Sequence, residues 1–322
     1  MTASPPGAPA RPDPALPEPG SGRPAALDGP RPPAAARWLI AAVRATRPRQ
    51  WPKNLLVLAA PIAGASLGRD DGAAYALVAL VAFIAASSAV YLVNDVIDAE
   101  RDRQHPVKRS RPIASGDLPA AHALVLAVAA AAAAVSAGFW IGEPRLTATV
   151  VAYLVISFCY TLWLKHVPVL ELFCVASGFV LRALGGAAAT HVPPSGWFLT
   201  VVSLGALMVA VAKRRGELAA LGAEAARHRP VMRWYRYGAL DVVALALTAA
   251  MIVSYGLWAL TSATGSRQLW NLASIAPLAV ALVRFERLSG RAAGRPVEDL
   301  ITRDKVMAGA ELAWLILFSL GL

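Results

Sequence analysis

The sequence predicts an all-α membrane protein with nine transmembrane helices, and three observations support this fold class. Hydrophobic residues make up 57% of the 322 residues and charged residues only 16%, and the mean hydropathy is +0.52. A soluble domain of this size could not hide so much apolar surface in its core. The apolar residues also form long runs, and Lys and Arg residues gather in alternate connections between these runs.

The first 36 residues consist mainly of Pro, Ala and Gly with a few charges. Such a segment cannot bury enough surface to offset the entropy lost on ordering, so residues 1–36 are predicted to form a disordered tail. The tail also lacks the apolar core and small-residue cleavage site of a secretory signal. Residues 37–322 form the predicted transmembrane domain.

Nine apolar segments follow the tail, each near the length needed to cross a hydrocarbon core of about 30 Å. They cover approximately residues 55–67, 73–93, 120–141, 146–164, 169–189, 197–212, 239–261, 269–283 and 306–322. The first and the eighth are short. Because a membrane span must satisfy its own backbone hydrogen bonds, and none of these segments alternates in polarity, each is predicted to be a helix.

The basic residues predict the orientation of these helices. Of the 31 Lys and Arg residues, only Arg69, Arg145 and Arg267 lie in the alternate loops, and Arg182 lies within a span. The positive-inside rule therefore places the N-terminus and the long connections in the cytoplasm and the C-terminus outside, in an inner (plasma) membrane. Termini on opposite sides require an odd number of spans, in agreement with nine.

The formal net charge of +11 raises the question of nucleic-acid binding. However, the basic residues form short clusters between apolar runs, and no basic stripe is interleaved with aromatic residues. No nucleic-acid partner is expected; anionic small molecules and lipid headgroups fit better. The two cysteines, Cys159 and Cys174, lie in apolar stretches and are too few for a metal site or a disulfide framework, so they are expected to act as small apolar residues.

A group of oxygen-bearing side chains follows the second apolar segment: Asn94, Asp95, Asp98 and Asp102. If the helix continues through them, their spacing places all four on one face. Carboxylates on one face repel each other unless a cation lies among them. Oxygen donors without Cys or His favour a hard ion such as Mg²⁺, which completes its coordination with water and substrate phosphates.

A basic run of Lys108, Arg109 and Arg111 comes next and ends at Pro112. These cations would hold the remaining phosphate charge of a substrate. A solvated loop paired by surface salt bridges is the alternative interpretation. The joint occurrence of the acidic spacing, the membrane boundary and the proline-terminated basic run favours a binding site.

The pattern Asn94-Asp95-x-x-Asp98-x-x-x-Asp102 with its basic run resembles the first aspartate-rich motif of the UbiA superfamily of intramembrane prenyltransferases. The resemblance extends from about Arg44 to the end of the chain. It implies nine helices around a central cavity that opens to the cytoplasm and laterally to lipid. It also implies that Asp95, Asp98 and Asp102 are catalytic and that Asn94, Asp98 and Asp102 hold Mg²⁺.

The chain departs from most of the superfamily at the connection after the sixth segment. A second aspartate-rich motif usually stands there and holds a prenyl diphosphate through Mg²⁺, whereas this chain has Lys213, Arg214, Arg215 and Glu217. A cationic site suits a substrate that is itself an unmetallated anion, such as a lipid monophosphate.

This substitution, together with stretches 47–54, 160–165 and 182–186, resembles one branch of the superfamily. Its members transfer 5-phosphoribose from phosphoribosyl diphosphate to decaprenyl phosphate, a polyprenyl phosphate, and release diphosphate. The product supplies cell-wall arabinan. No general base is needed, because a phosphate monoester is already mostly ionised near neutral pH.

Several further residues are expected to contact the substrates, by the resemblance and by their cytoplasmic placement. They are Lys53, Tyr91, Lys108, Arg109, Arg111, Tyr160, Lys165, Arg182, Lys213, Arg214 and Glu217. Each cation could instead serve only topology or headgroup contact. Arg182 is the strongest candidate, because an ionisable residue inside a span is costly and usually faces a polar cavity. Its structural alternative is an ion pair with a buried carboxylate such as Glu171. The nearby Gly185 and Gly186 would let a helix or a ligand approach closely.

Two other functions stay open. One is transfer of a prenyl group from a prenyl diphosphate to an aromatic or haem-like acceptor, which the missing second acidic motif disfavours. The other is a transporter or lipid-binding membrane protein. Charges at the membrane midplane and broken helices would be expected there, whereas the charged residues of this chain gather at the cytoplasmic edge. The many Ala and Gly residues in the spans leave a homo-oligomer open.

Overall fold

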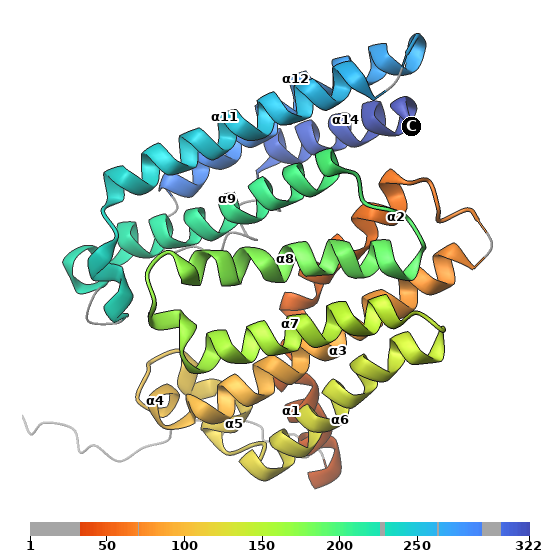
Figure 1. Cartoon of the computed structure of the whole chain (residues 1–322). Coiled ribbons are helices and arrows are strands. Elements are labelled where there is room, and N and C mark those ends of the chain that lie inside the picture. Colours follow the sequence, from red (N-terminus) through yellow and green to blue (C-terminus); the bar gives the residue numbers. More distant parts are fainter. Residues whose placement is uncertain (1–32, 70, 226–228, 263, 292–303) are drawn as a thin grey trace, which may run out of the picture.

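The computed structural model describes residues 33–69, 71–225, 229–262, 264–291 and 304–322, and within these ranges every regular element is a helix (Figure 1). Residues 1–32 of the predicted tail lie outside the described residues. Residues 34–36 already belong to the first turn of helix α1, Ala34–Ala45.

Seven helices of the described residues are long and apolar enough to cross a membrane, which makes the chain an integral membrane protein. They are α3 (Gly72–Ile97), α6 (Ala120–Trp140), α7 (Pro144–Leu162), α8 (Leu170–Ala189), α9 (Gly196–Leu221), α11 (Tyr237–Thr261) and α12 (Ser266–Arg291). They match the second to the eighth predicted segments.

The first and the ninth predicted segments take shorter forms. The first is a 3₁₀ helix, η1 (Pro48–Leu58), followed by α2 (Ala59–Ala63), and it contains Pro52. Proline removes a backbone donor and disfavours regular α-helix in this segment. The ninth is α14 (Lys305–Gly321), with 17 residues, which packs along α12 (Figure 1). The nine predicted spans thus correspond to seven long helices and two shorter segments.

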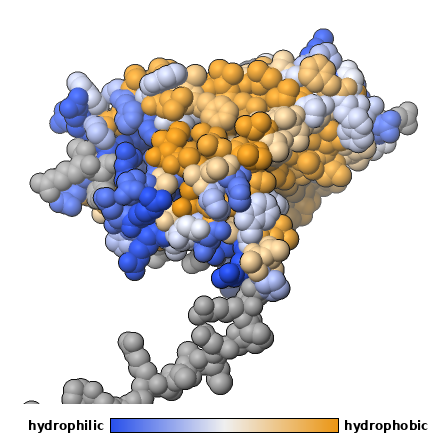
Figure 2. Space-filling model, turned by 90° about the horizontal axis from the view of Figure 1, so that it is seen from below, coloured by the Kyte–Doolittle hydropathy of each residue, from blue (hydrophilic) through white to orange (hydrophobic). Residues whose placement is uncertain are grey.

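Short elements connect the long helices at one end of the molecule. Between α3 and α6 lie α4 (Ala99–Arg103), η2 (Lys108–Ser110) and α5 (Pro112–Ser115). The other short elements are η3 (Leu164–His166), η4 (Gly222–Glu224) and η5 (Pro230–Trp234). Hydrophilic residues gather at this end, whereas hydrophobic residues cover the sides (Figure 2).

Small residues allow η1 and α3 to pack tightly on α8. A Cβ atom at Gly186 would lie 1.7 Å from the carbonyl oxygen of Val57, and one at Gly185 would lie 2.2 Å from the ring of Phe83. Both Val57 and Phe83 are fully buried in one core cluster. The expected close approach at this glycine pair is confirmed, and the group that approaches is protein.

Candidate active site

The acidic motif lies where α3 ends. The helix stops at Ile97, Asp98 adopts a non-helical conformation (φ −89°, ψ 0°), and α4 begins at Ala99. The expectation that one continuous helix presents all four motif residues on one face is therefore wrong. Around this turn the four residues form two pairs, Asp95 with Asp102 and Asn94 with Asp98.

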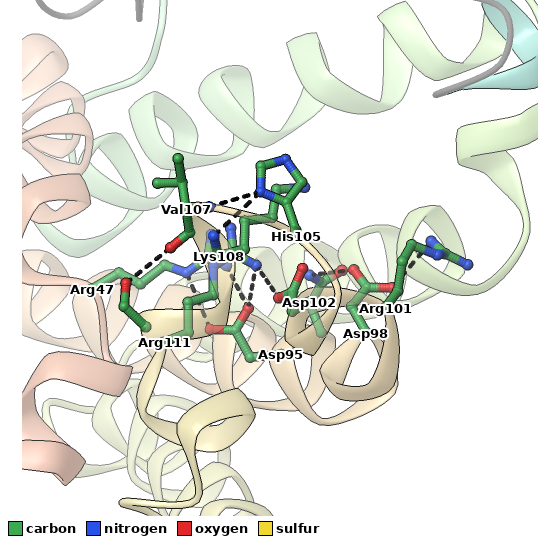
Figure 3. A network of polar contacts seen from close by, with 11 residues as sticks. Arg47, Asp95, Asp98, Arg101, Asp102, His105, Val107, Lys108 and Arg111 are labelled. Atoms are coloured by element: carbon green, nitrogen blue, oxygen red, sulfur yellow. Dashed lines mark hydrogen bonds and ion pairs between the residues drawn. The ribbon is translucent and has the colours of Figure 1, made fainter. Parts of the chain in front are cut away.

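Asp95 and Asp102 form the buried pair, each 3% exposed. The guanidinium of Arg111 bridges them, with Nη1 3.2 Å from Asp95 Oδ1 and 2.6 Å from Asp102 Oδ2. Arg47, which precedes η1, forms a second ion pair with Asp95 and stacks on the ring of Tyr91 at 4.9 Å. Figure 3 shows both arginines converging on Asp95.

Asn94 and Asp98 form the more accessible pair. The Asn94 amide donates a hydrogen bond to Asp98 Oδ2 at 3.1 Å, and Arg101 lies 3.6 Å from Asp98 Oδ1. Since the Arg101 side chain is 81% exposed, this contact is a surface ion pair. Among the described residues, Asp98 is thus the motif carboxylate whose arginine partner is itself largely exposed, whereas Arg47 and Arg111 are only about a quarter exposed.

The donor set fits a divalent metal shared with a substrate. In the described part of the chain, no three His, Cys, Asp or Glu side chains come together as a metal site. The protein would therefore contribute Asn94 and Asp98, and Mg²⁺ commonly takes one or two carboxylates with water and substrate phosphates. Asp102, predicted as a further ligand, is held by Arg111.

The basic run also contains both exposed residues and a residue that is held by an ion pair. Lys108 and Arg109 lie on η2 and are exposed, whereas Arg111 turns back to the buried carboxylates. The ring nitrogen Nδ1 of His105 accepts the backbone N–H groups of Val107 and Lys108 at 3.2 and 3.3 Å, which fixes this turn. Lys108 and Arg109 can reach a phosphate without breaking an ion pair.

Arg182 lies in the interior, 5% exposed, and its contacts are with neutral groups. Its Nε donates to Asn54 Oδ1 at 2.8 Å, Nη1 to the Gly178 carbonyl at 2.7 Å and Nη2 to the Tyr153 hydroxyl at 3.0 Å. Within the ranges described, no carboxylate pairs with it. The expected alternative, an ion pair with Glu171, is wrong.

Glu171 instead pairs with two other arginines. Its carboxylate is fully buried and lies 2.8 Å from Arg214 Nε and 2.6 Å from Arg229 Nη2. Arg229 also donates to the Tyr160 hydroxyl at 2.8 Å and to the Lys165 carbonyl at 3.4 Å. This cluster joins α7, α8 and α9 to the segment before η5.

Tyr235 lies beside this cluster, at the end of η5. Its hydroxyl accepts the Val169 N–H at 2.9 Å. Burial raises the pKa of the phenol.

Three consecutive cations on α9 point to different neighbours. Arg214 is 1% exposed and pairs with Glu171 and Glu217. Arg215 is equally inaccessible and pairs with Asp241 at 2.6 Å and Glu286 at 3.0 Å.

Lys213 differs from the two arginines because it is exposed. Three cations, Arg214, Lys53 of η1 and Arg229, and one anion, Glu217, lie near enough for their charges to act on it. Lys213 is therefore the cation of this group that is most accessible to an incoming anion.

The structure brings in residues that sequence reasoning missed. They are Arg47, which pairs with Asp95, Asn54 and Tyr153, which bind Arg182, and Arg229, which donates to Tyr160. For Arg47 and Asn54 a signal existed, since both stand in the stretch 47–54 that carries part of the resemblance. For Tyr153, in the middle of an apolar span, nothing in the sequence indicated a partner.

Comparisons with known proteins identify the family of this chain. The model of the UbiA prenyltransferase family matches residues 55–299. Decaprenyl-phosphate phosphoribosyltransferase of Mycobacterium tuberculosis is 39% identical over 285 residues, which cover 87% of this chain and 93% of that relative. The enzyme of the same name from Corynebacterium glutamicum is 35% identical over 277 residues, covering 84% of this chain and 83% of that relative.

A solved structure shares the fold at low identity. A UbiA homolog from Archaeoglobus fulgidus bound to GPP and Mg²⁺ superposes with a TM-score of 0.64 at 15% identity, covering 87% of this chain and 98% of that chain. The family model matches most of the sequence, and the solved structure has the same fold. The chain belongs to the UbiA prenyltransferase family.

Proposed function

We propose that this protein transfers 5-phosphoribose from phosphoribosyl diphosphate to a polyprenyl phosphate, decaprenyl phosphate in the name of its relatives, and releases diphosphate. The observation that carries the proposal is the character of α9 at its hydrophilic end. Lys213 is exposed there, and the nearby cations Lys53, Arg214 and Arg229 outnumber the nearby anion Glu217, where a second aspartate-rich motif would be expected. A cationic surface suits an acceptor that arrives as an anion.

In this reaction an oxygen of the lipid phosphate attacks the anomeric carbon of the ribose, and the bond from that carbon to the diphosphate oxygen breaks. The electron pair leaves with the diphosphate. Asn94 and Asp98 would hold Mg²⁺, which supplies positive charge to the leaving diphosphate. Lys108 and Arg109 would bind phosphate oxygens beside it, and Lys53 and Lys213 would orient the lipid phosphate.

In this proposal the ion-paired carboxylates do not contact the substrates; they hold arginine side chains in place. Asp95 and Asp102 hold Arg111 and Arg47 at the motif, and Glu171 holds Arg214 against α8. Arg182 offers a buried positive charge with neutral partners. We assign to it a contact with a substrate phosphate in the central cavity.

The membrane arrangement belongs to the same proposal. η1 with α2 and α14 would complete nine spans, with the N-terminus and the acidic motif on the cytoplasmic side of the plasma membrane. A 3₁₀ segment at membrane depth is tolerated where it is buried in protein or lines a cavity. The burial of Asn54 and Val57 in η1 supports this placement.

The test uses purified protein with phosphoribosyl diphosphate labelled in the ribose, decaprenyl phosphate and Mg²⁺. Label should enter the organic phase, and neither EDTA-treated protein nor Asp98→Asn should transfer it. A parallel reaction contains labelled prenyl diphosphate and an aromatic acceptor. Transfer only in that second reaction would replace the proposal with ordinary prenyl transfer.

A further inference from the structure

Helix α1 borders a groove that the proposed reaction does not use. The groove has a volume of 510 Å³ and lies between α1 and the turn that joins α5 to α6. Arg37, Trp38, Ile40 and Arg44 of α1 line one wall, and Asp117 of the turn lines the other. The groove is separate from Asn94 and Asp98.

The positive charge in the groove is available for a ligand. Arg37 and Arg44 stand seven positions apart, two helical turns, and therefore share one side of α1. Both are exposed, and among the described residues neither side chain has a hydrogen-bond or ion-pair partner. The Asp117 carboxylate accepts a hydrogen bond from Ser115 Oγ at 2.9 Å instead of pairing with either arginine.

Apolar surface adjoins these arginines. One side of α1 is buried in a core cluster through Ala41, Ala42 and Ala45, while Leu39 and Val43 remain 58% and 47% exposed. An amphipathic helix with both apolar and basic exposed residues suits the boundary between headgroups and acyl chains.

This apolar surface continues onto α6. Trp38 Nε1 donates to His122 Nδ1 at 3.1 Å, which joins α1 to the first turn of α6. One and two turns further, Val125 and Val128 are 67% and 70% exposed. Figure 2 views the molecule from the side of α1 and α6, where hydrophobic and hydrophilic surfaces meet.

We infer that this groove binds an anionic membrane phospholipid, with the headgroup phosphate between Arg37 and Arg44 and the acyl chains along α1 and α6. A phospholipid is the occupant because it supplies a phosphate and long apolar chains at the same place, which matches unpaired guanidinium groups beside exposed apolar side chains. The bound lipid also fixes the helix that leads to Arg47, which pairs with Asp95.

The test measures lipid binding to the full chain in detergent by native mass spectrometry, with phosphatidylglycerol and phosphatidylcholine as the two probes. The unaltered protein should bind phosphatidylglycerol more tightly. The double variant Arg37→Gln, Arg44→Gln should lose roughly 30-fold in affinity for phosphatidylglycerol, about fivefold for each arginine, and bind phosphatidylcholine as before.

A matched control removes two exposed arginines elsewhere. Arg236 and Arg287 are exposed and have no side-chain partner among the residues described. Arg236→Gln with Arg287→Gln changes the net charge equally and should leave lipid binding unchanged. The inference is overturned if the groove variant binds phosphatidylglycerol as tightly as the unaltered protein, if the control loses as much affinity, or if the unaltered protein does not distinguish the two lipids.

Discussion

Two substitutions of identical shape, Asp98→Asn and Asp95→Asn, separate the catalytic part of the acidic motif from its structural part. Asp98 is held by one amide hydrogen bond and one surface ion pair, so its charge contributes little to folding. We expect Asp98→Asn to lower turnover by at least about 100-fold, because the metal loses a charged ligand, which is several kcal/mol of stabilisation of the leaving group.

The expected stabilities follow from the contacts. Exposed pairs three or four residues apart on a helix contribute about 0.3 to 0.5 kcal/mol, so Asp98→Asn should change the free energy of unfolding by less than about 1 kcal/mol. Asp95 is 3% exposed and holds two arginines. Breaking a fully buried pair costs about 3 to 5 kcal/mol. Since Arg47 and Arg111 keep about a quarter of their surface in solvent, we expect roughly 2 to 4 kcal/mol for Asp95→Asn.

The measurement combines thermal unfolding in detergent, followed by tryptophan fluorescence, with phosphoribosyl transfer at several Mg²⁺ concentrations. Asp98→Asn should unfold within about 2 °C of the unaltered protein, and Asp95→Asn roughly 5 to 10 °C lower. Near-normal activity of Asp98→Asn at limiting Mg²⁺ would remove Asp98 from the metal site. Equal destabilisation by both changes would refute the division of the motif into two pairs.

Three further outcomes are expected. Lys213→Ala should raise the apparent KM for the lipid phosphate about tenfold and leave the melting temperature unchanged. Arg214→Ala should instead lower the free energy of unfolding by about 3 to 5 kcal/mol, because it leaves Glu171 with one partner. Equal melting temperatures of the two variants would contradict this contrast. Arg182→Lys keeps the charge but cannot reproduce the three hydrogen bonds of the guanidinium. We expect kcat/KM in the transfer assay to fall at least about tenfold and the melting temperature to fall as well. Normal kinetics with a lowered melting temperature would show that the role of Arg182 is purely structural. Gly186→Ala places a Cβ atom 1.7 Å from the carbonyl oxygen of Val57 and should lower the free energy of unfolding by about 1 to 3 kcal/mol or more. Thermal unfolding measures this change. A variant as stable as the unaltered protein would show that η1 moves easily away from α8.

The long helices could be predicted because lipid imposes a simple rule on sequence. A span of about 20 apolar residues must be helical, and the second to eighth predicted segments are the long helices of the structure. The form of the first segment could not be predicted in the same way. Pro52 lies inside the 3₁₀ segment, and this segment packs closely on α8 at Val57 and Gly186, a contact between distant parts of the chain that the local sequence does not reveal.

The site was predictable as a set of residue types but not as a set of partners. Lys213, Arg214 and Arg215 are equivalent in sequence, yet successive helical positions differ in direction by about 100°, so each meets a different neighbour. Only one of them stays exposed. Similarly, the interpretation of the acidic motif assumed a continuous helix, whereas the helix is interrupted at Asp98 and Arg111 of the following loop pairs with Asp95 and Asp102.

The distribution of charge explains how a site with several carboxylates can accept two phosphate-bearing substrates. Asp95 and Asp102 face Arg47 and Arg111, and Glu171 faces Arg214 and Arg229, so these carboxylates cannot strongly repel an incoming phosphate. Asp98 differs from the other two motif carboxylates because, among the described residues, its arginine partner Arg101 is largely exposed to solvent.

In the proposed reaction, Asn94 and Asp98 would hold Mg²⁺ against the diphosphate of the donor, since Mg²⁺ commonly binds substrate phosphates with only one or two protein carboxylates. The lipid monophosphate would need no metal if Lys53 and Lys213 supply positive charge directly. A second acidic motif on α9 would repel that monophosphate unless a second metal accompanied it. The cations of α9 therefore fit an acceptor that enters the site already ionised, such as a lipid phosphate. They do not fit a neutral acceptor that must first give a proton to a carboxylate at this position.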